Sequence, residues 1–460
     1  MHHNRILPLL AACTLAVPAL AQDELLTITV TGTRTPRPLE ETLVPTTVIT
    51  REEIDNSAAQ SVPELLQGRA GVDLINQGGR GKNTSLFLRG TNAEHVLLLV
   101  DGVRLGSATS GQPAFQHLPL EEIERIEIIR GPRSALYGSD AIGGVIQVFT
   151  RRGGEGQRVG GRVGYGTYDS REVALWAEGG RGNSSYALSA SHFNTEGFEA
   201  TTPDNFSFEP DDDGYQNNAL SLRGGHRFAN GLEVAAHALR AQGTTEFDGG
   251  AQDSEDDFLQ QVLGLDLEYS LTQSWTTSLQ LAESRDESEG EDFFFDTRRL
   301  SVYWQNDVEL TPDQLLTLGV DWYEDQVDSS TAFARTEAEQ TGLYGQYQGW
   351  NGPHQWLAGL RWEDTDAFGS ETTGNLGYGY EINPQLELTL SYGTGFKTPT
   401  FNDLFFPDVG FFRGNPDLEP ETSESFEVGL QGYHDRGYWR ASAFYTEIDD
   451  IIVFSPTRGT

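Results

Sequence analysis

Six acidic residues in two neighbouring segments provide the clearest candidate chemistry in this chain: Glu199, Glu209, Asp211, Asp213, Asp248 and Asp257. Three of them occupy alternate positions just before Gly214, which would place their oxygen atoms on one side of a loop. Carboxylate oxygens suit calcium and do not suit zinc. We therefore expect a structural calcium site in these loops. The alternative is a solvated run of acids in an acidic chain.

Catalytic residues, in contrast, do not form a recognisable pattern. The histidines are scattered without an HExxH motif, and the sequence contains no GxxxxGK[ST] phosphate-binding loop. The single cysteine, Cys13, lies near the N-terminus, so the rest of the chain has no thiol for catalysis or metal binding. We predict a protein that is not an enzyme.

The charge balance narrows the possible partners. The 460 residues include 31 Lys+Arg and 69 Asp+Glu, which gives a formal net charge of −38 and argues against binding to nucleic acid. Only 16 of the acidic residues lie in residues 22–154, where 13 basic residues nearly balance them. The acidity therefore belongs to residues 155–460.

The N-terminal segment resembles an export signal. Residues 1–21 contain a basic start with Arg5, an apolar stretch, and the small-residue cleavage pattern Ala19-Leu20-Ala21. A lipoprotein cleavage box ending at Cys13 is the alternative. In both cases we predict an exported protein, with a mature chain that begins at Gln22 if the segment is a signal peptide.

Hydrophobic periodicity divides the remaining chain into two parts. Residues 22–154 combine strand-like apolar runs with helical patches, including a short helix expected over residues 57–66, and indicate a mixed α/β domain. Residues 155–460 alternate between apolar and polar side chains in about fifteen segments. Short turns between these segments alternate with long acidic loops, such as residues 244–257 and 286–296.

This strand array fits a membrane barrel better than a soluble sandwich or propeller. The apolar faces end in aromatic residues, and loop length alternates as it does in outer-membrane barrels. In lipid, a strand array avoids unsatisfied edges only if it closes into a barrel. We therefore predict an all-β membrane barrel over residues 155–460, preceded by the α/β domain of residues 22–154.

Two motifs carry a resemblance to a known family. Residues 121–152 read EEIERIEIIRGPRSALYGSDAIGGVIQVFTRR, and residues 86–105 read LFLRGTNAEHVLLLVDGVRL. Both closely resemble the plug-domain signature of TonB-dependent outer-membrane receptors. The resemblance implies a plug inside a barrel of roughly 22 strands in the Gram-negative outer membrane. Because about 15 strands are present here, and SPTRGT does not resemble a closing strand, we expect the C-terminal strands to be missing.

The resemblance also implies an energy-coupling partner. The segment that resembles the TonB box comprises Leu25, Leu26, Thr27, Ile28, Thr29, Val30 and Thr31. A TonB-type protein, driven by an inner-membrane proton-powered complex, would add a strand to this segment and pull on it. The alternative is that the segment forms the first strand of the plug.

Within the family, the stretch INQGGRGKNTSLFLRGTNAEHV (residues 75–96) is similar to the plug of cobalamin importers. Carried over by motif position, the corrinoid-contacting residues would be Gln77, Asn83, Ser85, Asn92, Thr109 and Ser110. We thus expect import of a corrinoid, with calcium in the extracellular loops. The alternatives are a ferric siderophore or haem as cargo, or a passive or adhesive barrel.

Overall fold

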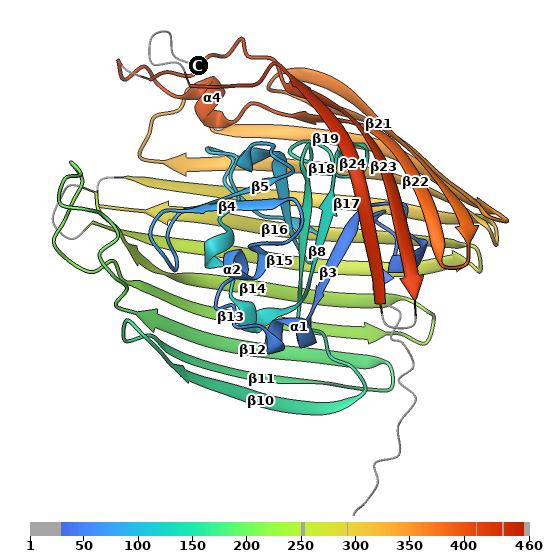
Figure 1. Cartoon of the computed structure of the whole chain (residues 1–460), viewed down its shortest axis with the longest axis horizontal. Helices are drawn as coiled ribbons and strands as arrows, with labels where there is room; N and C mark the ends of the chain where they lie inside the picture. The colour runs from blue at the N-terminus through green and yellow to red at the C-terminus, as the bar shows by residue number, and fades with distance from the viewer. Residues whose placement is uncertain (1–28, 250–253, 292, 411, 435–436, 455–460) are drawn as a thin grey trace, which may run out of the picture.

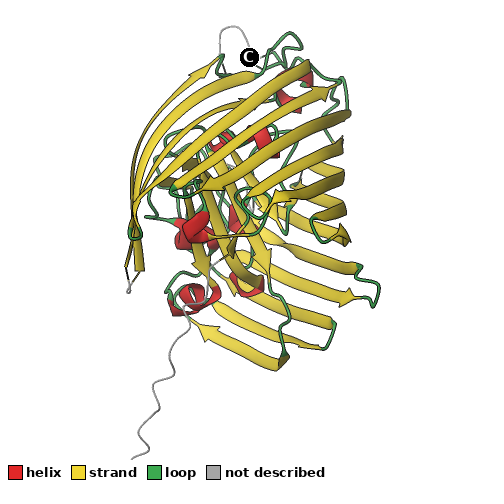
Figure 2. Cartoon of the chain, turned by 90° about the vertical axis from the view of Figure 1, so that its right-hand side faces the viewer, coloured by secondary structure: helices red, strands yellow, loops and turns green. Residues whose placement is uncertain are grey.

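A curved sheet wrapped around an N-terminal domain makes up this protein (Figures 1 and 2). The computed structural model describes residues 29–249, 254–291, 293–410, 412–434 and 437–454. The predicted signal peptide, residues 1–21, and the predicted TonB-box residues Leu25, Leu26, Thr27 and Ile28 lie outside the described residues.

Within the described residues, the curved sheet contains fifteen antiparallel strands, which follow one another in chain order. This number confirms the fold class and the strand count expected from the periodicity. The strands are β10 (Gly156–Tyr165), β11 (Arg171–Arg181), β12 (Ser184–Thr195), β13 (Tyr215–Arg227), β14 (Glu233–Glu246), β15 (Glu255–Thr272), β16 (Trp275–Glu289), β17 (Phe294–Thr311), β18 (Gln314–Ser329), β19 (Glu337–Asn351), β20 (His354–Thr365), β21 (Gly369–Asn383), β22 (Leu386–Lys397), β23 (Glu421–His434) and β24 (Gly437–Asp449).

Strand alternation gives the sheet one apolar face and one polar face. On β15, Leu263 and Leu265 are exposed on the outer face. Asp266 lies on the inner face and accepts a hydrogen bond from Gln280 (2.7 Å), which also donates to the backbone oxygen of Asp101 in the N-terminal domain (3.1 Å). The outer face is therefore suited to lipid and the inner face to a polar plug.

The two ends of the sheet differ in their connections. At one end, two-residue turns join several of the strand pairs, as at residues 182–183 and 273–274. The other end, at the left of Figure 1, carries the longer loop of residues 196–214. The long loop expected at residues 286–296 is in fact mostly strand, because β16 and β17 stay paired as far as Glu289 and Phe294.

The N-terminal domain, here called the plug, is built on a mixed five-stranded sheet in the order β3-β8-β9-β6-β7, in which β6 and β9 are parallel. Its strands are β1 (Thr29–Val30), β2 (Arg37–Pro38), β3 (Thr46–Thr50), β4 (Val72–Asn76), β5 (Thr84–Leu88), β6 (Val96–Val100), β7 (Val103–Arg104), β8 (Ile123–Arg130) and β9 (Gly144–Thr150). The helices in the described ranges are α1 (Arg51–Asn56), α2 (Val62–Leu66), α3 (Ser134–Tyr137) and α4 (Phe401–Phe405), with 3₁₀ turns η1 (Leu39–Glu41), η2 (Ala93–His95), η3 (Phe115–His117) and η4 (Leu120–Glu122). None of the helices in the described ranges is long and apolar enough to span a membrane.

The helix expected over residues 57–66 begins only at Val62. The side chain of Ser61 accepts a hydrogen bond from the backbone N–H of Glu64, and Pro63 lies in the first turn. Both features favour a helix start at this point. The prediction was therefore right about the helix but placed its beginning too early.

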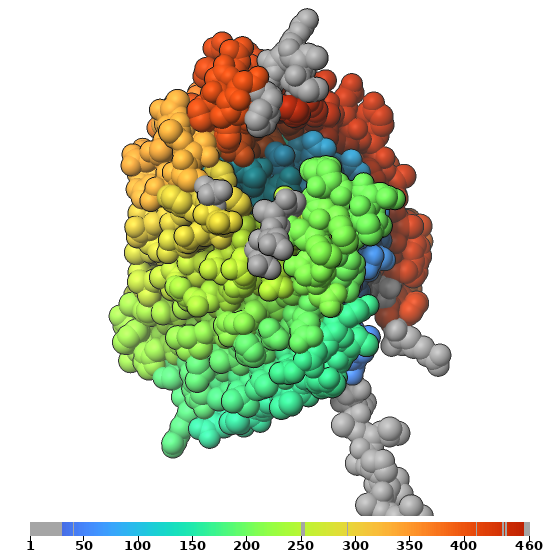
Figure 3. Space-filling view, turned by 90° about the vertical axis from the view of Figure 1, so that its left-hand side faces the viewer, coloured from blue at the N-terminus to red at the C-terminus, as the bar shows by residue number. Residues whose placement is uncertain are grey.

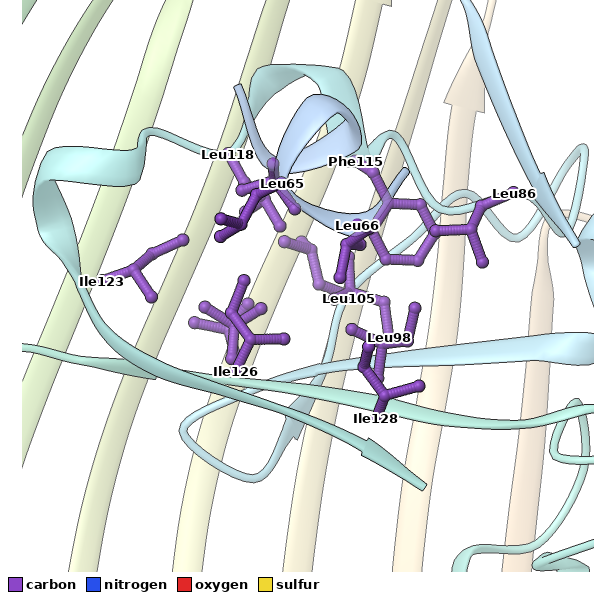
Figure 4. Packing of buried hydrophobic residues seen from close by; sticks show 14 of the residues in the cluster. Leu65, Leu66, Leu86, Leu98, Leu105, Phe115, Leu118, Ile123, Ile126 and Ile128 are labelled. Carbon is purple, nitrogen blue, oxygen red and sulfur yellow. The ribbon is translucent and has the colours of Figure 1, made fainter. Parts of the chain in front are cut away.

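A hydrophobic core holds the plug together (Figure 4). Leu66, Ile126 and Ile128 are fully buried there, and the cluster extends to Leu239 and Val262 on the inner face of the curved sheet. Burial of apolar surface is the main favourable contribution to folding. The plug is thus seated against the sheet by apolar packing as well as by polar contacts.

Candidate ligand-binding and cation site

A pocket of about 510 Å³ lies at the long-loop end of the sheet, between the plug and the loops. Figure 3 looks at this end of the molecule, where plug residues are visible in a hollow between the loops. The pocket is lined by Gln77, Gly81, Lys82, Asn83, Ala114, Gln116, His117, Ala200, Thr201, Ser207, Asp213, Thr245, Phe247, Asp248, Asp256, Phe258, Gln260, Asp286, Glu287 and Ser288.

The residues expected to contact a substrate are not all brought to this pocket. Gln77 and Asn83 line it, and the backbone N–H of Gln77 donates to the oxygen of Asn83 (3.1 Å), which closes the loop between them. Ser85 is half-buried on β5 and does not line the pocket.

The remaining three residues lie nearer the C-terminal strands. The oxygen of Thr109 accepts a hydrogen bond from the backbone of Asn402 on α4 (3.2 Å), and the adjacent Ser110 is exposed. Asn92 is also exposed, and its backbone N–H donates to Nδ1 of His95 (3.1 Å). The predicted contact set is therefore divided between two regions of the plug surface.

Three of the six predicted metal ligands come together beside the pocket. One carboxylate oxygen from each of Glu199, Asp213 and Asp248 lies within 4.8 Å of the other two. Burial raises the pKa of Asp213, and the negative charge of Asp248 raises it further. Oδ2 of Asp248 is buried and has no hydrogen-bond partner within the described part of the chain. A cation at this point would satisfy that oxygen.

The other three predicted ligands have different surroundings. The carboxylate of Glu209 accepts hydrogen bonds from Gly249 N and Ser254 Oγ (2.8 Å each), so it braces the loop beside the cluster. Asp211 is exposed. Asp257 is also exposed and accepts a hydrogen bond from Thr244 Oγ1 (2.6 Å).

Strand alternation explains the position of Asp257. Adjacent side chains on a strand point to opposite faces, and it is Asp256, not Asp257, that lines the pocket together with Phe258 and Gln260. Sequence reasoning missed Asp256. The alternation through residues 256–260 was the signal that would have identified it.

The pocket is predominantly acidic. Five of its lining residues carry carboxyl groups: Asp213, Asp248, Asp256, Asp286 and Glu287. Lys82 opposes them, and its Nζ donates to the backbone oxygen of Gly214 at 2.7 Å. Burial lowers the pKa of Lys82 to about 8, while the charges of Asp213 and Glu246 counteract this change. Without a bound cation, the pocket would repel anions.

An aromatic stack forms part of the pocket wall. The ring of His117 lies parallel to Phe258, with centroids 3.7 Å apart, and Tyr215 lies alongside them. Burial lowers the pKa of His117 to about 3, with a smaller contribution from the positive charge of Lys82. The imidazole is therefore neutral at physiological pH.

Because His117 is neutral when buried, we expect its packing against Phe258 and Tyr215 of the curved sheet to depend on pH. His117 titrates near pH 6.5 when exposed and near pH 3 when buried. Its contribution to packing is therefore complete above about pH 6.5 and decreases as the pH falls towards 3. Amide hydrogen exchange of residues 114–120, corrected for intrinsic rates, should show looser packing at pH 5 than at pH 7. The variant His117→Phe should remove this difference, and an equal difference in both proteins would contradict the assignment.

A second cluster of polar contacts lies where the plug begins. Nη1 and Nη2 of Arg34 pair with the two carboxylate oxygens of Asp321 on β18 (3.0 Å each), and Asp321 also accepts a bond from Arg361 (2.8 Å). The guanidinium of Arg34 lies 4.6 Å from the ring centroid of Tyr344. These contacts clamp the chain just after the predicted TonB box to the curved sheet.

The described end of the predicted TonB box is also anchored. Thr29 and Val30 form β1, which pairs with β2. The backbone N–H of Thr31 donates to Oε2 of Glu127 (2.8 Å), and the hydroxyl of Tyr137 donates to the oxygen of Thr31 (2.9 Å). A force applied before residue 29 would therefore act first on these polar contacts.

Comparisons with known proteins cover both parts of the chain. Residues 38–145 match the family model for the TonB-dependent Receptor Plug Domain, and residues 150–460 match the model for the TonB dependent receptor-like beta-barrel. Among curated proteins, the chain is similar to a "Vitamin B12 transporter BtuB" of Photobacterium profundum, with 34% identity over 93% of this chain and 70% of that protein. It is similar to the protein of the same name from Vibrio vulnificus, with 34% identity over 94% and 71%.

Solved structures share the same fold at lower identity. The siderophore receptor PirA from Acinetobacter baumannii matches with a TM-score of 0.74 and 19% identity, covering 88% of this chain and 71% of that chain. The FrpB iron transporter from Neisseria meningitidis matches with a TM-score of 0.76 and 14% identity, covering 91% and 75%. At these identities the matches support a common architecture and give no information on cargo.

Proposed function

Because this chain belongs to the TonB-dependent receptor family, we propose that it imports cobalamin or a related corrinoid. Membership confirms the predicted family and fold. It also establishes that the chain is an outer-membrane β-barrel receptor for TonB-dependent transport and not an enzyme. The identity of the cargo and the role of a cation are the proposed parts.

One observation carries the choice of cargo. Gln77 and Asn83, two of the expected corrinoid contacts, face a pocket that also contains members of the acidic cluster. Relatives at 34% identity over most of the chain are named vitamin B12 transporters. Residues 75–96, which resemble the plug of cobalamin importers, therefore also contribute Gln77 and Asn83 to the pocket lining.

The charge of the pocket argues against the alternative cargo. Many ferric siderophores are anionic, and haem carries carboxylates, so they would be repelled by Asp256, Asp286 and Glu287, the acidic lining residues that the proposed calcium would leave unpaired. The corrin ring of a corrinoid presents neutral amide side chains, which can form hydrogen bonds with carboxylates and other polar groups. Cobalamin thus fits the pocket better than an anionic chelate does.

We propose that calcium binds at Glu199, Asp213 and Asp248. Calcium takes six to eight oxygen ligands, so the carboxylates would be supplemented by other oxygen atoms of the loops or by water. The unpartnered Oδ2 of Asp248 supports this assignment. Binding would offset the repulsion among the three carboxylates and order the loop of residues 196–214.

A paired substitution tests the cation site. Replacing both Asp213 and Asp248 by asparagine keeps the side-chain shape and removes two charges, so calcium affinity should fall by about tenfold or more. Titration calorimetry measures this change directly. The control is Asp257→Asn, because Asp257 lies away from the cluster and should leave the affinity unchanged. A control that weakens binding as much as the pair does would contradict the site.

Transport requires a plug that can be displaced, and its polar contacts are suited to this. Arg89 pairs with Glu427 on β23 at 2.9 Å, His95 pairs with Glu421, and Arg34 pairs with Asp321. Water can replace such contacts as the plug moves. After substrate binds at the loop end, a TonB-type partner would act on the opposite end of the plug.

A ligand panel tests the proposed cargo. Cyanocobalamin, a ferric siderophore and haemin are each offered to the full-length receptor in detergent, and retained ligand is measured after gel filtration. Retention of cyanocobalamin alone supports the proposal. Retention of either iron chelate without cyanocobalamin would favour the alternative cargo.

A further inference from the structure

The plug loop of residues 78–82 is sterically interlocked with the loop that carries the acidic cluster. A β-carbon added at Gly81 would lie 2.0 Å from the ring of Tyr215, and one added at Gly79 would lie 2.8 Å from the ring of Phe198. Contacts below 3.0 Å cannot form unless a neighbour moves. The two segments therefore fit together only because these positions are glycine.

A lysine ties the same plug loop to the chain next to a proposed cation ligand. Nζ of Lys82 donates to the backbone oxygen of Gly214 at 2.7 Å, directly after Asp213. It also lies 3.3 Å from Oγ1 of Thr245, which in turn donates to the backbone oxygen of Gly81 (3.4 Å). Lys82 is only 4% exposed, so little water competes for these bonds.

A second contact lies next to another proposed ligand. Ala200 follows Glu199, and its backbone N–H donates to Oδ2 of Asp213 at 3.0 Å. The side chain of Ala200 lies 2.7 Å from the position that a β-carbon at Gly78 would occupy. Ala200 and Gly214, which directly follow Glu199 and Asp213, thus also contact the plug.

We call the contact between residues 78–82 and residues 198–215 the seam. Its plug side lies next to residues that line the pocket. Gln77 and Asn83 flank residues 78–82, and their backbones are hydrogen-bonded to each other. The loop that bears Glu199 and Asp213 therefore touches the same plug loop that holds these two side chains in the pocket.

We infer that the seam between residues 78–82 and residues 198–215 couples the cation site to the ligand-binding face of the plug, with Lys82 as the positioning residue. This inference rests on the proposed cation site and goes further by assigning the path of coupling. Without a cation, repulsion among the carboxylates spreads the loop; with one, Glu199 and Asp213 are drawn together. Their neighbours, Ala200 and Gly214, then fix the position of the plug loop of residues 78–82.

Two substitutions break the seam in different ways. Lys82→Met keeps the length of the side chain and removes the donor. Gly81→Ala introduces the clash with Tyr215, and Gly68→Ala is its matched control, because Gly68 has nearly the same backbone angle (φ +76° against +77°) with nothing within 4 Å of an added β-carbon. Both alanines are strained by a positive φ angle of nearly the same size, but only the alanine at position 81 would contact Tyr215.

Hydrogen exchange separates coupling from cation binding. The full-length receptor is examined with and without calcium, following residues 77–83 and residues 196–214 as separate peptides. In the wild type and in Gly68→Ala, calcium should slow exchange in both segments. In Lys82→Met and Gly81→Ala, calcium should still slow exchange in residues 196–214 and should no longer do so in residues 77–83.

Cobalamin titrations give an independent measure. Coupling between two sites is typically about 5- to 150-fold and is reciprocal. The factor by which calcium strengthens cobalamin binding should therefore fall to about onefold in the two seam variants and persist in Gly68→Ala. Protection of residues 196–214 but not of residues 77–83 in the wild type would overturn the coupling while leaving the cation site intact. Calcium that protects neither segment would overturn both.

Discussion

Replacing Asp321 by alanine is expected to release the start of the plug from the barrel wall. Arg34 would lose both of its carboxylate bonds while its guanidinium stayed buried against Tyr344. Removing one partner of a buried ion pair costs about 3–5 kcal/mol, because the remaining charge is left uncompensated. The chain that follows the predicted TonB box should consequently detach even without substrate.

Amide hydrogen exchange of residues 30–38 measures this release. The matched control is Glu233→Ala, which breaks the exposed pair between Arg227 and Glu233 on the barrel (side chains 62% and 44% exposed). Exposed pairs contribute about 1 kcal/mol or less, so the control should leave exchange in residues 30–38 unchanged. Unchanged protection of this segment in Asp321→Ala would show that the clamp does not hold it.

Loss of energy coupling is the second large effect that we expect. The predicted TonB box would be recognised by strand addition, which requires backbone N–H groups. Proline lacks this group, so Ile28→Pro should abolish cobalamin uptake by whole cells. Binding at the long-loop end should be unaffected, because the residues that line the pocket, such as Gln77 and Asn83, are unchanged.

The control for this experiment is Ile28→Ala, which keeps the N–H and should retain most uptake. Uptake of labelled cobalamin and binding to isolated outer membranes are measured in parallel. Undiminished uptake by Ile28→Pro would argue against the box and would favour a passive barrel. Loss of both binding and uptake would instead indicate damage to the receptor.

Features that depend on local periodicity could be predicted from the sequence. Alternation along segments such as residues 263–271 predicted the strand count, because side chains on a strand point alternately to lipid and lumen. The plug motifs predicted the family. Loop length was predicted less well: residues 286–296 are mostly strand, since the ion pair between Arg285 and Asp296 (2.7 Å) supports pairing beyond the apolar stretch.

Features that depend on register and curvature could not be predicted. Arg34 and Asp321 are 287 positions apart, and Lys82 and Gly214 are 132 apart, so their contacts become visible only when the sheet curves around the plug. The acidic spacing included Glu199, Asp213 and Asp248, the three residues whose carboxylates converge. It did not distinguish them from Asp211 and Asp257, since composition does not determine which side chains converge.

Cobalamin binding with and without calcium tests the central proposal most directly. Labelled cyanocobalamin is titrated into the full-length receptor in outer-membrane lipid, once with calcium and once with a chelator. The proposal predicts saturable binding that calcium strengthens by about tenfold or more, within the usual range of coupling between two sites. No saturable binding in either condition would contradict the cobalamin assignment.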